Sequence, residues 1–215
     1  MKSIPWVLVF CVALFPATLP AQFLSNWGVK TAVTRSTLDI DQFHNFASWR
    51  TGMNLAVYAE HHLWKFFAIT PQLEYAQKGY IAEQVETSET GTTIQQVQAN
   101  TRLDYVSVPL FLKLTYPTET LTPFVAVGPR MDYLAHVKKG RFHFTEVTAV
   151  DPRAENFKSF ALGGSFTGGV NIPVSTNSEM SVELRYNGDF TNSATDQVQY
   201  SLKNTTVDLW IGLAF

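Results

Sequence analysis

The stretch that decides the fold is the end of the chain, Val207-Asp208-Leu209-Trp210-Ile211-Gly212-Leu213-Ala214-Phe215. Apolar residues occupy every second position from Val207 to Phe215, and Asp208, Trp210 and two small residues lie between them. Successive side chains of a β-strand point to opposite faces of a sheet. The period of two therefore predicts a strand with one fully apolar face.

The same alternation recurs along the chain. It is found in residues 27–34, 52–58, 67–78, 106–114, 125–133, 160–172 and 180–187. We find no helical period of convincing length, no internal repeat and no domain boundary. The sequence therefore predicts an all-β fold of eight strands.

Composition narrows the class of protein. The chain has 215 residues, of which 46% are hydrophobic and 16% are charged, and its formal net charge is −2. No basic field is available for nucleic acid. The one continuous apolar run, residues 4–15, is shorter than the roughly 20 residues that a membrane-spanning helix needs, which excludes a multi-span helical membrane protein.

The first 21 residues have the layout of a secretory signal peptide. Lys2 precedes the apolar run, and small and turn-forming residues lead to Ala21, after which we expect cleavage. Residues 22–215 are then predicted to form a single domain. The only cysteine, Cys11, leaves with the signal, so we expect neither a disulfide nor a thiolate metal site in the mature chain.

The predicted connections alternate in length. Short connections are expected at 61–65, 117–121 and 174–178, and longer ones at 37–48, 82–101, 135–158 and 191–197. The stretch 83–100, rich in Glu, Thr and Gln, is predicted to be an exposed loop. This asymmetry is typical of an antiparallel up-and-down barrel in the outer membrane, with short periplasmic turns and longer extracellular loops.

The second face of the strands carries charges at mid-strand positions. A soluble lipocalin-type barrel would leave that face in water, whereas an eight-stranded membrane barrel would enclose it in an interior just wide enough for side chains. We favour enclosure, because charges of both signs can pair there. The prediction is an ion-pair network that plugs the lumen, with a narrow polar pore as the alternative. The network consists of Lys30, Glu74, Lys78, Lys113, Arg130, Asp132, Glu183, Arg185 and Asp208.

The final strand must pair with the first, because an open sheet edge in lipid leaves unpaired backbone groups that cost several kcal/mol each. Its apolar residues resemble the C-terminal signal by which outer-membrane barrels are recognised for insertion. The predicted assembly signal is Val207, Leu209, Ile211, Leu213 and Phe215. Aromatic residues near the strand ends suit the two girdles at the membrane interfaces, namely Trp27, Trp49, Trp64, Tyr80, Tyr105, Tyr116, Tyr133 and Tyr186.

Four short motifs follow one another along the chain. They are LEYAQKG at 73–79, YVSVPLFLK at 105–113, PFVAVGP at 123–129 and ELRY at 183–186. In this order they resemble the motifs of the PorT-type outer-membrane β-barrel family. The resemblance implies an eight-stranded barrel in the outer membrane of a Bacteroidota-type bacterium. It implies little about activity, although some members of that family serve a protein-secretion system.

The sequence carries no catalytic motif of the G-x-S-x-G, H-E-x-x-H or P-loop type. His61 and His62 are predicted to lie in a short turn, where a metal site would need further ligands. His136 and His143 could form a hydrolase site at the extracellular rim with Ser159 or Glu146, but a solvated loop explains them as well. We predict no catalytic residues, no cofactor and no metal.

Two classes of function follow from these observations. The first is a structural or interaction component of the cell envelope, with outer-membrane lipid, the barrel-assembly machinery and a secretion or envelope complex as partners. The second is an outer-membrane enzyme that hydrolyses lipid or peptide at the extracellular rim. A passive porin is disfavoured by the strand number.

Overall fold

The computed structural model describes residues 26–40, 47–87, 93–118, 120–142, 147–150, 157–193 and 202–215. The predicted signal peptide, 1–21, lies outside these ranges. The strands are β1 (Asn26–Ile40), β2 (Ala47–Trp64), β3 (Phe67–Thr87), β4 (Thr93–Thr115), β5 (Thr122–Phe142), β6 (Val147–Val150), β7 (Phe160–Ser175), β8 (Ser178–Asp189) and β9 (Leu202–Ala214).

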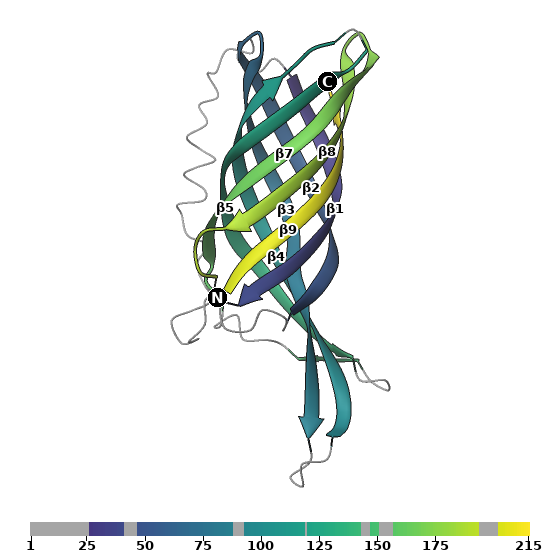
Figure 1. The fold of residues 1–215 in the computed structure, drawn as a ribbon, viewed down its shortest axis with the longest axis vertical. Coiled ribbons are helices and arrows are strands. Elements are labelled where there is room, and N and C mark those ends of the chain that lie inside the picture. Colours follow the sequence, from purple (N-terminus) through teal and green to yellow (C-terminus); the bar gives the residue numbers. More distant parts are fainter. Residues whose placement is uncertain are drawn as a thin grey trace.

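Eight of these strands close into an antiparallel barrel, as the sequence predicts (Figure 1). The order of the strands around the wall is β1, β2, β3, β4, β5, β7, β8 and β9, and each strand pairs with its neighbours in this order. The pairing of β9 with β1 closes the circle. At the β1–β9 seam the backbone amides of Trp27 and Phe215 donate to each other's carbonyl oxygens, at 3.3 and 2.8 Å. The described part of the sheet therefore has no open edge in the barrel wall.

The period of two sorts side chains between the two faces of the wall. In β9, Leu209 and Ile211 are about half exposed, whereas Asp208 and Trp210 are buried. The same alternation holds in the middle of the other seven barrel strands, where the outward side chains are mostly apolar and the inward ones mostly polar or small. The predicted assignment of faces is confirmed.

The two ends of the barrel differ. At one end, which we call the turn end, the connections are Lys65–Phe66, residues 116–121 and Thr176–Asn177. At the other end, the loop end, β3 and β4 continue past the wall as a teal hairpin that projects beyond the barrel (Figure 1). The short strand β6 pairs with Lys139–Phe142 of β5 at this end.

Several predicted loops are strands instead. The stretch 83–100 was expected to be an exposed loop, yet 83–87 and 93–100 pair with each other in β3 and β4, with Gln84 opposite Val97. Likewise 135–142 belongs to β5. Polar composition suggested loops, but β-branched residues such as Val85 and Val97 favour extended backbone, and cross-strand hydrogen bonds do not depend on an apolar face.

The prediction that His61 and His62 lie in a short turn is also wrong. They lie in β2, opposite Ile69 and Ala68 of β3, and the turn is confined to Lys65 and Phe66. None of the described segments forms a helix that is long and apolar enough to cross a membrane.

Candidate functional site

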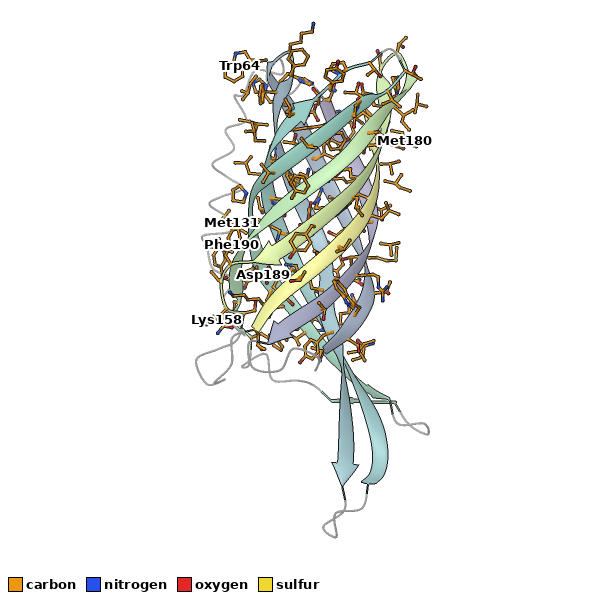
Figure 2. The ribbon with its side chains drawn as sticks, in the orientation of Figure 1. Trp64, Met131, Lys158, Met180, Asp189 and Phe190 are labelled. Carbon is orange, nitrogen blue, oxygen red and sulfur yellow. The ribbon has the colours of Figure 1, made fainter. Side chains whose placement is uncertain are left out.

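The barrel interior gathers most of the charged side chains that the structure buries. All nine residues of the predicted network point into it, with exposed fractions from 0% for Asp132 to 7% for Lys113. Figure 2 places Trp64 at the turn end, and Asp189 and Lys158 toward the loop end. The interior charges form three clusters between these ends.

The central cluster consists of Lys30, Glu74, Glu183 and Arg185. Arg185 on β8 donates from Nη1 to Glu74 on β3 and from Nη2 to Glu183, the latter at 3.2 Å. Lys30 on β1 donates to the other Glu183 oxygen at 2.9 Å. Gln72 accepts a further bond from Arg185 at 3.2 Å. Two cations and two anions therefore balance within hydrogen-bonding distance.

The loop-end cluster consists of Lys78, Arg130, Asp132 and Asp189. Asp132 accepts from Lys78 at 2.6 Å and from Nε of Arg130 at 2.9 Å. Asp189 accepts from Nη2 of Arg130 at 2.6 Å, and Lys78 lies 3.6 Å from it. Asn204 donates to the second Asp189 oxygen. This cluster is also neutral.

The turn-end cluster is the pair of Lys113 on β4 and Glu60 on β2, joined at 2.7 Å. His62 lies 3.3 Å from the other Glu60 oxygen and is partly exposed. Removing one member of a buried pair leaves an uncompensated charge and costs about 3–5 kcal/mol. The three clusters therefore constrain the strands that carry them.

Asp208 differs from the other network residues. Among the described side chains, Thr34 and Asn187 hydrogen-bond its two oxygens, Asn187 at 2.7 Å, and no lysine or arginine forms an ion pair with it. The structure therefore brings eight of the nine predicted residues into ion pairs and leaves Asp208 held by neutral donors.

Aromatic rings fill the space between the charges. The Arg185 guanidinium carbon lies 4.7 Å from the ring centre of Phe111 and 4.6 Å from that of Trp210. The Lys113 ammonium lies 4.3 Å from the ring centre of Phe124. Cation–π contacts of this kind add to the ion pairs where water is excluded.

Two small voids lie inside the described part of the barrel. A void of about 20 Å³ separates the central and turn-end clusters, and a second of about 10 Å³ lies beside Tyr58 and Glu179. The buried hydroxyls of Thr70 and Ser181 line the larger void and have no hydrogen-bond partner in the described structure. A void of this size holds about one water, which would satisfy them.

Sequence reasoning missed Glu60 and Asp189. Both lie two residues beyond a predicted strand, after 52–58 and 180–187, and both continue its inward-facing alternation. Extending each strand by one step of the same period would have found them.

The outward face forms an apolar belt that includes all five residues of the predicted assembly signal. Their exposed fractions run from 36% for Val207 to 52% for Leu209. The largest apolar patch on a soluble monomer is typically about 300–600 Å², whereas here exposed Val, Leu, Ile, Met and Phe side chains occur on all eight barrel strands. This wall is suited to a hydrocarbon surrounding.

Some of the predicted girdle aromatics lie at the turn end of this belt. Trp27, Trp64 and Tyr116 are 57%, 72% and 70% exposed, and the Trp27 ring contacts Phe215 at 5.4 Å. The prediction that Tyr105 belongs to a girdle is wrong, because Tyr105 is fully buried inside the barrel. Tyr80, also predicted for a girdle, packs against the same buried cluster. Tyr105 continues the inward alternation of Ser107, Pro109 and Phe111, whereas the girdle prediction used only its nearness to a strand end.

The two candidate hydrolase residues that the structure describes, His136 and Ser159, are not joined to each other. His136 and Ser159 are exposed near the loop end, and no hydrogen bond joins them in the described structure. His143 and Glu146 lie outside the described residues. Within the described ranges, no group of three or more His, Cys, Asp or Glu side chains could hold a metal ion.

The chain matches the sequence profile of one known protein family. Residues 21–195 match the sequence profile described as Outer membrane protein beta-barrel domain. No curated protein matches the chain at a significant level.

Solved structures with a similar fold include the following three bacterial proteins. Ail, the attachment invasion locus protein of Yersinia pestis, is 12% identical, with 88% of this chain and 98% of Ail covered and a TM-score of 0.41. Neisserial surface protein A is 9% identical, with 86% and 95% covered and a TM-score of 0.45. A major outer membrane protein from Thermus thermophilus is 14% identical, with 87% and 98% covered and a TM-score of 0.45.

Proposed function

This chain belongs to the outer membrane protein beta-barrel domain family, and from that membership and its packed interior we propose that it is a non-enzymatic structural and interaction component of the cell envelope. The protein lies in the outer membrane. The proposal includes removal of residues 1–21 on export, with 22–215 as the single barrel domain.

The observation that carries the proposal is the interior. Charged clusters occupy the loop end, the centre and the turn end of the described lumen, and the void between the central and turn-end clusters holds about one water. A barrel filled in this way is a plugged anchor and not a pore. The ion pairs of the interior then hold the two rims of the barrel in fixed positions.

The loop end supports a role in interaction. In outer-membrane barrels the longer connections face the outside of the cell. The β3–β4 hairpin extends past the wall at that end, and β6 widens the sheet beside β5 (Figure 1). A rigid barrel that raises a hairpin above the membrane is suited to contact another envelope protein.

The finer part of the proposal is membership of the PorT-type group and service to a protein-secretion or envelope complex. Its support is the four motifs in order. Their charged members Glu74, Lys78, Lys113, Glu183 and Arg185 all lie in the ion-pair clusters, so the motif residues help to build the packed interior.

Two measurements test the proposal. In planar bilayers the purified barrel should show no steady conductance, and stable voltage-independent channels would contradict a plugged lumen. After crosslinking in intact cells and detergent extraction, the protein should co-purify with a defined envelope protein. A variant with residues 83–100 replaced by a short turn is the control and should lose that partner while keeping the barrel. Recovery of the barrel without any partner in both samples would contradict the interaction role.

A further inference from the structure

Two arginines meet on the outer wall near the loop end. Arg102 on β4 lies on the same face as Tyr75 and donates to its hydroxyl at 2.9 Å. Arg50 on β2 donates from Nε to Asn100 of β4 at 3.1 Å, although β3 runs between β2 and β4. Gly79 of β3, which has no side chain, is paired with Arg102 between these two strands.

Gly79 cannot be replaced without disturbing this arrangement. Its φ is 140°, and a Cβ there would lie 2.0 Å from the carbonyl oxygen of Thr101. The backbone therefore requires glycine at the point where the two arginines approach each other.

The two guanidinium groups have more donors than the protein satisfies. Asp104 accepts from Nε and Nη2 of Arg102, at 2.6 and 3.0 Å. Arg50 uses Nε alone, and its Nη1 is buried without a hydrogen-bond partner in the described structure. Lys138 lies directly opposite Arg102 in the β4–β5 register and is exposed. Asp104 is thus the carboxylate paired with Arg102, and Arg50 and Lys138 add two further cations beside that pair.

An apolar groove begins next to these cations. It has a volume of about 680 Å³ on the outer wall of β9, β1, β2, β3 and β4, and its lining includes Leu55, Leu73, Tyr75, Val106 and Ile211. Tyr75 belongs to both features, because its ring lines the groove and its hydroxyl accepts from Arg102.

We propose that this combination is a binding site for an outer-leaflet lipid whose headgroup carries a phosphate monoester. Arg50, Arg102 and Lys138, here called the arginine patch, bind the phosphate, and the groove holds an acyl chain. Guanidinium groups match the geometry of phosphate oxygens with paired N–H donors. The patch lies at the loop end, the end that faces outward in this class of barrel. A free phosphate ion has no acyl chain and would leave the apolar groove empty.

The test compares lipids with and without a phosphate monoester. The full mature protein is folded into phosphatidylcholine vesicles with or without phosphatidic acid, extracted in mild detergent and examined by native mass spectrometry. We expect retained phosphatidic acid on the wild type and about a tenfold or greater loss of retention in R50Q and R102Q. R50K and R102K keep the charge but lose the paired donors, and should show an intermediate loss.

Controls separate the site from general attraction. R35Q removes an exposed arginine from the outer face of β1 and should retain phosphatidic acid as the wild type does. Thr31→Phe fills the groove without touching the patch and should reduce retention. Millimolar inorganic phosphate should not displace the lipid. Each variant is first checked for the heat-dependent gel shift of a folded barrel.

Three results would overturn the proposal. Equal losses in R35Q and R50Q would mean nonspecific charge attraction. Displacement by inorganic phosphate would assign the patch to a free anion. Equal retention of phosphatidylcholine and phosphatidic acid by the wild type would show that the patch does not recognise the phosphate monoester.

Discussion

Arg185 on β8 donates a hydrogen bond to Glu74 on β3, although these strands stand on opposite sides of the barrel. Four strand steps separate them in either direction around the eight-stranded wall. Lys78 on β3 and Asp189 on β8 span the same diameter nearer the loop end, at 3.6 Å. The interior charges therefore link strands that share no backbone hydrogen bond.

The Arg185–Glu74 bond predicts a large loss of stability when one partner is removed. Arg185→Gln should lower the free energy of unfolding by about 3–5 kcal/mol, because Glu74 and Glu183 remain buried without their cation. Urea unfolding in vesicles, followed by tryptophan fluorescence, measures the change. The double variant Arg185→Met/Glu74→Met should recover part of the loss. A single variant as stable as Arg35→Gln, which removes an exposed charge, would contradict this reading.

Asp132 and Asp208 should respond differently to the same substitution. Asp132→Asn removes the anion between Lys78 and Arg130 and should cost about 3 kcal/mol or more. Asp208→Asn keeps a polar side chain for Thr34 and Asn187 and should cost less than about 1.5 kcal/mol. The comparison uses the same unfolding assay. Equal costs would mean that Asp208 belongs to an ion pair after all.

Leu184 tests whether the outward face meets lipid. It is 61% exposed in the middle of β8. Arginine at the bilayer midplane of a barrel costs about 2–4 kcal/mol, so Leu184→Arg should impair folding into vesicles. Leu184→Met, which keeps an apolar side chain, is the matched control and should fold normally. Normal folding of the arginine variant would place this face in water.

Phe215 tests the predicted assembly signal. Phe215 and Phe160 are both 50% exposed outward aromatics, but only Phe215 contacts Trp27 at the β1–β9 seam. Phe215→Ala should lower the folded yield in cells while export across the inner membrane continues. Phe160→Ala should have a smaller effect on yield, as judged by the gel shift of outer-membrane fractions. Equal yields would show that Phe215 carries no assembly information.

Much of the fold could be predicted, because the alternation of apolar and polar residues indicates on which face of the sheet each side chain lies. Lys30, Lys113 and Arg185 were assigned to the interior in this way, and the family motifs pointed to the same barrel. The pairing partners could not be predicted. Whether Arg185 meets Glu74 or Asp208 depends on the stagger of strands around the barrel, which a strand-by-strand pattern does not contain.

The errors have equally local causes. The girdle prediction for Tyr105 used nearness to a strand end, although the alternation of Ser107 and Pro109 already places Tyr105 on the inner face. Glu60 and Asp189 lie at strand ends, where polar composition hides the alternation. The arginine patch brings together residues of β2 and β4 that are far apart in the sequence, on either side of Gly79 in β3, and a strand-by-strand pattern does not show such a contact.

The two ion pairs across the diameter, Arg185–Glu74 and Lys78–Asp189, also have a mechanical consequence. A thin-walled tube squeezed by a bilayer flattens toward an ellipse unless its opposite walls are tied together. Here they are tied at two depths, and close-packed interiors compress little and transmit strain. A pull on the long connections at one surface of the membrane should therefore reach the turns at the other surface as motion of one stiff body.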